Sequence, residues 1–276
     1  MTTTSEKGAA TRGRRQRVQA VTTGISVLKG LASLGGRASL TALAKQISEN
    51  PAKVHRYLIS LMEEGLIAQD PLSLQYYLGA EAIQIGLAAM RLVDPIRIAE
   101  PALIGLRESL GVTCFVAVMG NKGPTIVRFE EPALPVTLNV RVGSVLSLLW
   151  SATGRTFLAF MSDSRVERMA RDELARTTDQ QRRVLDAADP IGMLRQDVRK
   201  AGMAIVRDTN LQGISAIAVP LFDFSGKVSA VLTALGATGG FDTNPEGPVA
   251  RALRQAGETI SADLGFVAGS VSGTGK

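Results

Sequence analysis

Lys53 and Arg56 lie three residues apart in a segment that predicts a helix over residues 51–64. Side chains at this spacing share one face of a helix. Ammonium and guanidinium groups on such a face donate hydrogen bonds to phosphates and, in the major groove, to guanine O6 and N7, where one contact contributes about 1–3 kcal/mol of base discrimination. The two cations therefore indicate a nucleic-acid contact. The alternative is a solvated helix face.

The elements around these cations predict a helix-turn-helix. A helix over residues 39–47 comes first, and a three-residue turn at 48–50 joins it to the helix at 51–64. Asn50 followed by Pro51 favours a helix start, because the Asn side chain accepts from unpaired N–H groups and Pro already has the φ of a first turn. The side chains opposite the cations are apolar: Val54, Leu58 and Leu61. Such a pair fits the major groove of DNA.

Flanking elements extend this pair to a winged helix-turn-helix. We expect an earlier helix over 18–34 and, after Gly65, a hairpin of two short strands, 66–68 and 74–78, around a turn at 69–73. A hairpin directly after a recognition helix is a wing. The stripe expected to pack the first helix against the pair consists of Val21, Ile25, Leu28 and Leu31.

Candidate DNA contacts in this domain fall into groups by position. The major-groove group is Ala52, Lys53 and Arg56. The phosphate group is Ser39, Thr41, Lys45 and Tyr57, and the wing group, for the DNA backbone or minor groove, is Gln75 and Tyr76. Exposure to solvent without contact is the alternative for each group. His55, the only histidine, either contacts phosphate or packs, and we do not expect it to bind a metal.

Charge is unevenly distributed along the chain. The net charge is +6, and residues 1–80 hold ten Lys/Arg against five Asp/Glu, whereas residues 81–276 hold 21 against 20. This asymmetry favours a polyanion as partner. Four arginines between residues 12 and 17 supply part of the excess. They belong to a polar stretch, 1–17, that we expect to be a disordered basic tail; it either follows the minor groove or is a leader without function.

The composition of the chain indicates the cellular compartment in which the protein works. No apolar run approaches the ~20 residues of a membrane-spanning helix, and the N-terminal residues lack the hydrophobic segment of a secretory signal. The single cysteine, Cys114, allows no intrachain disulfide. These features favour the reducing cytoplasm and no membrane partner.

Catalytic motifs are missing from the sequence. The one histidine lies on the expected DNA-binding helix, which leaves the rest of the chain without the base of a Ser-His-Asp or Cys-His system. No cluster has metal-ligand spacing, and no Gly-rich phosphate loop occurs. Cys114 lies in an apolar strand, as an inert core thiol does. We therefore expect no enzyme activity and no cofactor.

The chain after the wing predicts a linker and a second domain. Residues 80–94 predict a helix that is apolar around most of its circumference, and such a helix must be covered by a neighbouring domain or a second subunit. Residues 95–268 predict an α+β domain, followed by a flexible tail at 269–276. Its expected strands are 112–119, 125–129, 136–142, 203–206, 214–221 and 228–235, and its helices are 95–110, 151–161, 164–176, 190–200 and 245–264.

Segments in this order resemble the IclR-type family of bacterial transcription regulators over residues 18–268. Residues 54–58, Val-His-Arg-Tyr-Leu, are similar to the family's Val-His-Arg-Leu-Leu, and 77–79, Tyr-Leu-Gly, to its Tyr-Arg-Leu-Gly. Residues 141–155 include Arg-Val-Gly and Ala-Thr-Gly-Arg, like the family's Arg-Val-Gly and His-Ala-Thr-Ala-x-Gly-Lys. Residues 213–223 resemble its Gly-Ile-Ser-Cys-Ile-Ala-Ala-Pro-Val-Phe-Asp.

The resemblance implies a winged helix-turn-helix DNA-binding domain at 18–79, a linker helix and a GAF-like domain that binds a small organic acid effector. It also implies a homodimer, or a dimer of dimers, on double-stranded operator DNA. A pocket would form between the sheet and residues 143–160. The effector-binding residues that it implies are Leu146, Leu148, Trp150, Ser151, Ala152, Thr153, Gly154, Ile214, Ala216, Thr233 and Leu235.

Two departures from the family pattern make this pocket more apolar. The histidine before Ala-Thr is replaced by the run Leu-Leu-Trp-Ser at 148–151, and the cysteine of Gly-Ile-Ser-Cys is Ala216. An apolar wall with Trp150, beside a helix start at Gly154 that can bind a carboxylate, favours an aromatic acid. Arg141 or Arg155 would add positive charge. The alternative is that Trp150 and its neighbours are ordinary core.

Three functions remain as hypotheses. The favoured one is a ligand-responsive transcriptional regulator, either a repressor or an activator, of a catabolic operon. The second is a constitutive or architectural DNA-binding dimer whose larger domain only oligomerises. The third is a small-molecule-binding enzyme with a vestigial helix pair.

Overall fold

The computed structural model describes residues 18–132 and 140–267, which form two compact units divided after Leu92. The tails expected at 1–17 and 269–276 lie outside the described residues. None of the helices in the described ranges has the length and apolar character that a membrane crossing needs.

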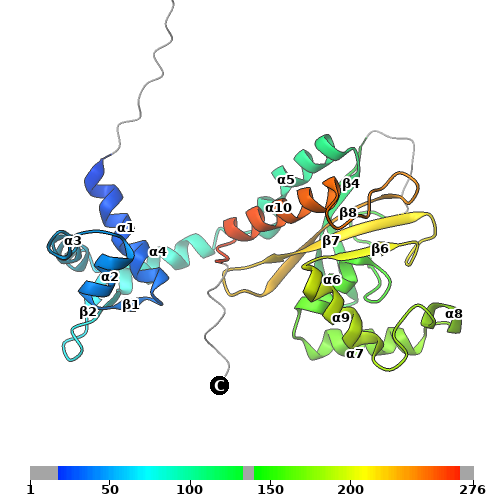
Figure 1. Cartoon of the computed structure of the whole chain (residues 1–276), viewed down its shortest axis with the longest axis horizontal. Helices are drawn as coiled ribbons and strands as arrows, with labels where there is room; N and C mark the ends of the chain where they lie inside the picture. Colours follow the sequence, from blue (N-terminus) through cyan, green and yellow to red (C-terminus); the bar gives the residue numbers. More distant parts are fainter. Residues whose placement is uncertain (1–17, 133–139, 268–276) are drawn as a thin grey trace, which may run out of the picture. The chain divides into compact units, whose positions relative to one another are not determined.

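The first unit is a winged helix-turn-helix (Figure 1). Its elements are α1 (Gln19–Ser33), β1 (Arg37–Ala38), α2 (Leu40–Gln46), α3 (Pro51–Glu63), β2 (Ile67–Gln69), β3 (Tyr76–Leu78) and α4 (Ala80–Met90). The strands form one antiparallel sheet in the order β1-β3-β2. The predicted helix pair and wing are confirmed, and β1 adds a strand that the sequence did not indicate.

Side-chain caps fix where α2 and α3 begin. The Ser39 hydroxyl accepts from the Ala42 N–H at 3.3 Å, and the Asn50 side chain accepts from the Ala52 N–H at 2.8 Å. Pro51 occupies the first turn of α3, as predicted. A cap of this kind stabilises a helix by about 1 kcal/mol. These caps therefore fix the first residues of α2 and of α3.

The face of α1 that packs on the helix pair differs from the predicted one. Val21 is 62% exposed and Ile25 46% exposed, so these two members of the predicted stripe are wrong. The buried residues of α1 are Thr23, Val27, Gly30 and Leu31. Gly30 allows the close approach, because a Cβ there would lie 2.4 Å from Cγ2 of Ile47. The spacing of apolar residues in the sequence did not indicate that Gly30 packs against α2.

α4 has no buried residue within its unit. Its large apolar side chains are exposed, at 60% for Ile83, 61% for Ile85 and 48% for Leu87. This helix was expected to be apolar around most of its circumference, and the described residues of its own unit do not cover it.

The second unit is an antiparallel sheet covered by helices on both faces (Figure 1). The strand order is β5-β4-β8-β7-β6. The strands are β4 (Thr113–Gly120), β5 (Gly123–Glu130), β6 (Ala204–Arg207), β7 (Ile214–Phe222) and β8 (Val228–Ala237). The helices are α5 (Pro95–Leu110), α6 (Ala152–Phe160), α7 (Ser164–Ala175), α8 (Asp179–Arg182), α9 (Pro190–Ala201) and α10 (Pro248–Asp263).

Alternating side chains divide the core of this unit between the two faces of the sheet. Cys114 and Val116 point to the face that α5 and α10 cover, and Phe115 and Ala117 to the face that α6 covers. A strand places successive side chains on opposite faces, which explains the division. Burial raises the pKa of the Cys114 thiol to about 12, so the reactive thiolate is scarce at neutral pH.

Some element boundaries differ from the prediction. The strand expected at 136–142 falls mostly on 133–139, outside the described residues, and its remainder at 140–142 is not in a strand. The last helix begins at Pro248 rather than near 245, and the short helix α8 was not foreseen. The other expected elements of the unit agree to within a few residues.

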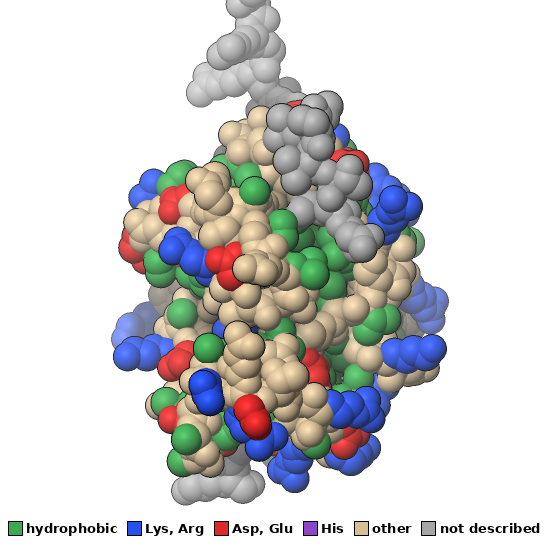
Figure 2. Space-filling model, turned by 90° about the vertical axis from the view of Figure 1, so that its right-hand side faces the viewer, with side chains coloured by type: hydrophobic (Ala, Val, Ile, Leu, Met, Phe, Trp, Pro, Cys, Tyr) green, Lys and Arg blue, Asp and Glu red, His purple; other side chains and the backbone are tan. Residues whose placement is uncertain are grey.

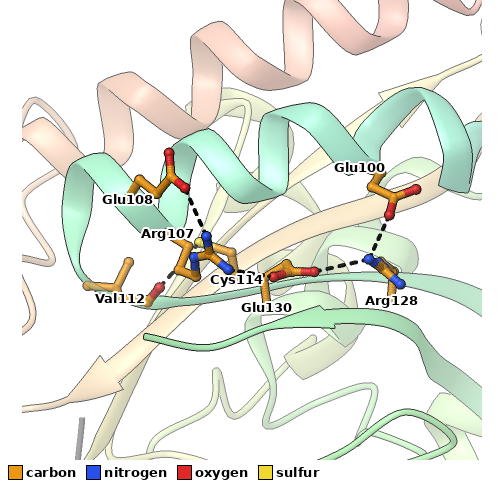
Figure 3. A network of polar contacts seen from close by, with 7 residues as sticks. All are labelled: Glu100, Arg107, Glu108, Val112, Cys114, Arg128 and Glu130. Atoms are coloured by element: carbon orange, nitrogen blue, oxygen red, sulfur yellow. Dashed lines mark hydrogen bonds and ion pairs between the residues drawn. The ribbon is translucent and has the colours of Figure 1, made fainter. Parts of the chain in front are cut away.

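Ion pairs fasten α5 to β5 (Figure 3). Glu130 accepts from Arg107 at 3.0 Å and from Arg128 at 3.1 Å, and Arg128 also bonds Glu100 on α5 at 2.6 Å. The Glu130 side chain is only 15% exposed. Charge-assisted bonds at partly buried positions are stronger than neutral ones, so this network holds α5 against the edge of the sheet.

Candidate DNA-binding surface and ligand pocket

The outward face of α3 carries the predicted major-groove residues. Val54 and Leu58 are fully buried, whereas Ala52 and Arg56 are exposed. Lys53 is partly exposed and pairs with Glu49 one turn earlier, with 2.7 Å between Nζ and Oε1. A surface pair of this type contributes about 0–1 kcal/mol. Lys53 can therefore leave Glu49 and bind a phosphate or a base at little cost in free energy.

The predicted phosphate contacts lie at both ends of α2 and on α3. Ser39, Thr41 and Lys45 are exposed, and Tyr57 is partly buried against the core of the unit. Gln75 of the wing is partly exposed. These residues keep the exposure that a backbone contact needs.

Tyr76 is a correction to the predicted wing contacts. Its side chain is 4% exposed and packs in the core of the first unit. Tyr76 belongs to the same cluster as Leu31 of α1 and Leu58 of α3, so it faces the helices rather than the solvent. Its neighbour Tyr77 is partly exposed, with the Arg37 guanidinium 5.2 Å from the ring centroid.

Arg37 is an exposed cation that the sequence reasoning missed, because it lies on the unforeseen strand β1. It pairs with Asp70 of the wing turn at 3.2 Å. Asp70 accepts from the N–H groups of Ser73 and Leu72, and these bonds hold its pKa below the ordinary value. Asp70 therefore orders the wing turn and positions Arg37 beside it.

The second unit contains a pocket between the sheet, the start of α6 and the loop at 208–213, with a volume of about 40 Å³. Predicted residues that line it are Leu146, Ser151, Ala152, Thr153, Ile214, Ala216, Thr233 and Leu235. Lining residues that the sequence reasoning missed are Phe115, Val140, Val206, Asn210 and Leu211. Sheet pairing and the loop bring these together from distant parts of the chain.

Leu148, Trp150 and Gly154 do not line this pocket, which corrects the prediction. Leu148 and Trp150 are 2% and 7% exposed and belong to a separate cluster with α7. The turn at 148–150 directs their side chains to α7 instead of the sheet. Gly154 faces the Ser147 carbonyl, where a Cβ would lie 2.0 Å from the oxygen. Trp150 is therefore ordinary core, which was the alternative interpretation.

The polar side chains among the described residues that line the pocket are neutral. The Thr153 and Thr233 hydroxyls are 2.9 Å apart and buried. Ser151 donates to the Ser147 carbonyl at 2.6 Å and accepts from the Gly154 N–H at 2.9 Å. Ala152 and Thr153 begin α6, where backbone N–H groups lack partners within the helix.

No Lys, Arg or His is among the described residues that line the pocket. Arg155 points elsewhere, since its Nε donates to the Leu149 carbonyl at 2.8 Å, and burial lowers its pKa. Arg141 is exposed and does not line the pocket. Neither arginine supplies the charge that was predicted for this site. The start of α6 is therefore the element of the pocket wall best suited to an anion.

Charged side chains do not gather in one patch on the face of the protein that Figure 2 shows. On the face shown in Figure 2, Lys and Arg side chains occur at several places with Asp and Glu between them. This agrees with the near balance of charge after residue 80, and differs from the excess in the first part of the chain.

Known proteins match this chain over both units. The model of the IclR helix-turn-helix domain matches residues 20–71, and that of the bacterial transcriptional regulator IclR C-terminal domain matches residues 88–262. The crystal structure of Pseudomonas aeruginosa HmgR is 35% identical, with a TM-score of 0.82, and covers 93% of this chain and 100% of that one.

Curated relatives are more distant but span most of the chain. The DNA-binding transcriptional repressor YiaJ of Escherichia coli is 25% identical over 90% of this chain and 88% of its own. The HTH-type transcriptional regulator BhcR of Paracoccus denitrificans is 26% identical over 72% of this chain and 71% of its own. The domain matches cover most of the chain in the same order as its two units. The chain belongs to the IclR family of bacterial transcriptional regulators.

Proposed function

We propose that this regulator responds to a small organic acid, with an aromatic acid as the first candidate, and controls a catabolic operon. The observation that supports this most is the pairing of an outward basic face on α3 with a pocket in the second unit. The basic face of α3 would bind operator DNA, with Lys53 and Arg56 in contact with bases. Phosphate contacts would come from Ser39, Thr41 and Lys45.

The lining of the pocket supports an acid with an apolar body. Phe115, Leu146 and Leu235 supply apolar contact, and the first N–H groups of α6 suit a carboxylate. A volume of about 40 Å³ is room for a few waters. A ring would have to push part of the wall outward. Leu211, 43% exposed at the mouth, is the side chain best placed to move.

This required opening connects binding to regulation. A ligand that binds only an opened pocket shifts the protein toward the open conformation. The ratio of its affinities for the open and closed states sets how far this equilibrium can shift. In a dimer, such a shift would change the separation of the two copies of α3. Two half-sites on DNA need a fixed separation, near one helical turn or a multiple. Ligand binding would thereby alter operator affinity.

We expect Ala216→Leu to abolish the ligand response and leave operator binding intact. Ala216 is 8% exposed and lines the pocket, so a larger side chain fills about the space that the ligand needs. Overpacking of this kind costs about 1–3 kcal/mol. Ala237→Leu, at an exposed position on β8, is the matched control.

The measurement is a thermal-shift screen of aromatic and short organic acids, followed by operator affinity with each hit. The wild type and the control should respond to the same acid, and Ala216→Leu should not. Complete silence of the wild type across the screen would favour the second candidate function, a constitutive DNA-binding dimer. The exposed apolar surface of α4 is the observation that keeps this candidate open.

The same surface leads us to propose that α4 is a dimer contact. Leu87→Glu should weaken self-association at least tenfold, because a charge would be buried in an apolar contact. Leu87 is 48% exposed within its own unit, so the fold of that unit should not change. Gln84→Glu adds the same charge at an exposed polar position of α4 and is the control. Sedimentation velocity over a concentration series would measure both; equal association of the two variants would contradict the proposal.

A further inference from the structure

A single carboxylate holds the turn that precedes the wall of the pocket. Glu173 on α7 accepts from the Ser147 hydroxyl, from the Leu148 N–H at 2.9 Å and from the Leu149 N–H at 3.5 Å. These three donors approach both oxygens of one side chain. A carboxylate is the acceptor that suits such a set, because it has no hydrogen to oppose them.

Ser147 extends this arrangement to the start of α6. Its hydroxyl, which donates to Glu173, also accepts from the Trp150 N–H at 2.7 Å. Its carbonyl accepts from the Ser151 hydroxyl at 2.6 Å, and Ser151 is the N-cap of α6. The chain of bonds therefore runs from α7 to the first turn of α6, where the pocket begins.

The mouth of the pocket is joined to the same turn. Thr209 donates from its hydroxyl to the Trp150 carbonyl at 2.7 Å. The next two residues, Asn210 and Leu211, line the pocket. Leu146 lies immediately before the turn and also lines it. Both the wall and the mouth therefore meet at the turn at 147–150.

We propose that Glu173 is a positioning residue for the effector pocket, although it does not line it. Its carboxylate fixes the turn at 147–150 and thereby places Leu146, Ser151 and the first N–H groups of α6 for a ligand. The inference rests on the proposed function in one respect, that this pocket is the effector site. The conformational role of Glu173 does not depend on which ligand binds.

Glu173→Gln tests the role of the carboxylate at nearly constant size. One oxygen of the amide can still accept, but its NH₂ group would face a donor of the turn. Glu167→Gln, on the same helix, is the matched control, because Glu167 pairs with Arg195 at 2.8 Å and takes no part in the turn. Ser147→Ala is a second test, since it removes the hydroxyl that joins Glu173 to Trp150.

Hydrogen exchange of the full-length protein without ligand is the deciding measurement. We expect the amides of residues 147–154 to exchange at least tenfold faster in Glu173→Gln and in Ser147→Ala than in the wild type. Their exchange rate should be unchanged in Glu167→Gln. The amides of β7 and β8 should keep their protection in all three variants. Unchanged exchange at 147–154 in Glu173→Gln would overturn the inference. An equal acceleration across the whole second unit would also overturn it, because Glu173 would then contribute only general stability.

A second arm uses sodium benzoate as the probe and separates this inference from the proposed function. Benzoate should protect residues 151–154 of the wild type, and its affinity should fall at least tenfold in Glu173→Gln. Equal benzoate affinity in the two proteins would contradict the positioning role. Absence of protection in the wild type would count against an aromatic acid as effector, and exchange without ligand would still decide the role of Glu173.

Discussion

Arg56→Ala should lower operator affinity at least tenfold and flatten its dependence on salt. Arg56 is exposed on the outward face of α3, while Val54 and Leu58 on the opposite face are buried in the core of the first unit. Loss of one base contact costs about 1–3 kcal/mol per half-site. Loss of a phosphate contact reduces the slope of log affinity against log salt by about one. Fluorescence anisotropy with labelled operator, from low to physiological salt, measures both quantities.

Arg254→Ala is the control for the change of net charge. Arg254 lies on α10 in the second unit and approaches Glu246 at 3.8 Å. Its loss removes the same charge from a part of the protein that we do not assign to DNA. If the two variants bound operator equally well, the assignment of α3 as the recognition helix would be wrong.

Gly154→Ala should destabilise the second unit by about 3 kcal/mol or more, although Ala favours helices. A Cβ at Gly154 would lie 2.0 Å from the Ser147 oxygen and 2.5 Å from Cα of Leu148, and both are backbone atoms. They cannot move without breaking the turn that Glu173 holds. The expected fall in Tm is roughly 6–12 °C, measured by calorimetry.

Gly105→Ala provides a control of opposite sign. Gly105 lies within α5, and a Cβ there would meet nothing within 4 Å. The same substitution should therefore raise stability by about 0.5–1 kcal/mol through helix propensity and a less flexible unfolded chain. A fall in Tm for Gly105→Ala equal to that for Gly154→Ala would show that close packing is not the cause.

Local signals in the sequence predicted much of the fold. Asn50 with Pro51 set the start of α3, and Gly111, with φ at 64°, ends α5 as an αL cap. Apolar runs bounded by turn sequences placed β4, β7 and β8 to within a few residues. These signals act within a few residues, so a single sequence displays them without knowledge of tertiary contacts.

Predictions that depended on tertiary contacts were less successful. Tyr76 is buried because its side chain lies on the face of β3 that packs against the helices, and three-residue strands show too little alternation to reveal which face is inside. Trp150 packs towards α7 because the turn before α6 redirects it, an outcome that depends on Glu173 more than twenty residues later. Asn210 and Leu211 reach the pocket on a loop that no local pattern relates to α6.

The central claim is that the outward face of α3 reads bases in a DNA groove. The most direct test selects an operator from random duplexes with the wild type and then measures the affinity of every single-base variant for the wild type and for Arg56→Ala. We expect Arg56→Ala to lose base preference at one position of each half-site and to keep it elsewhere. An unchanged preference at every position would contradict the claim.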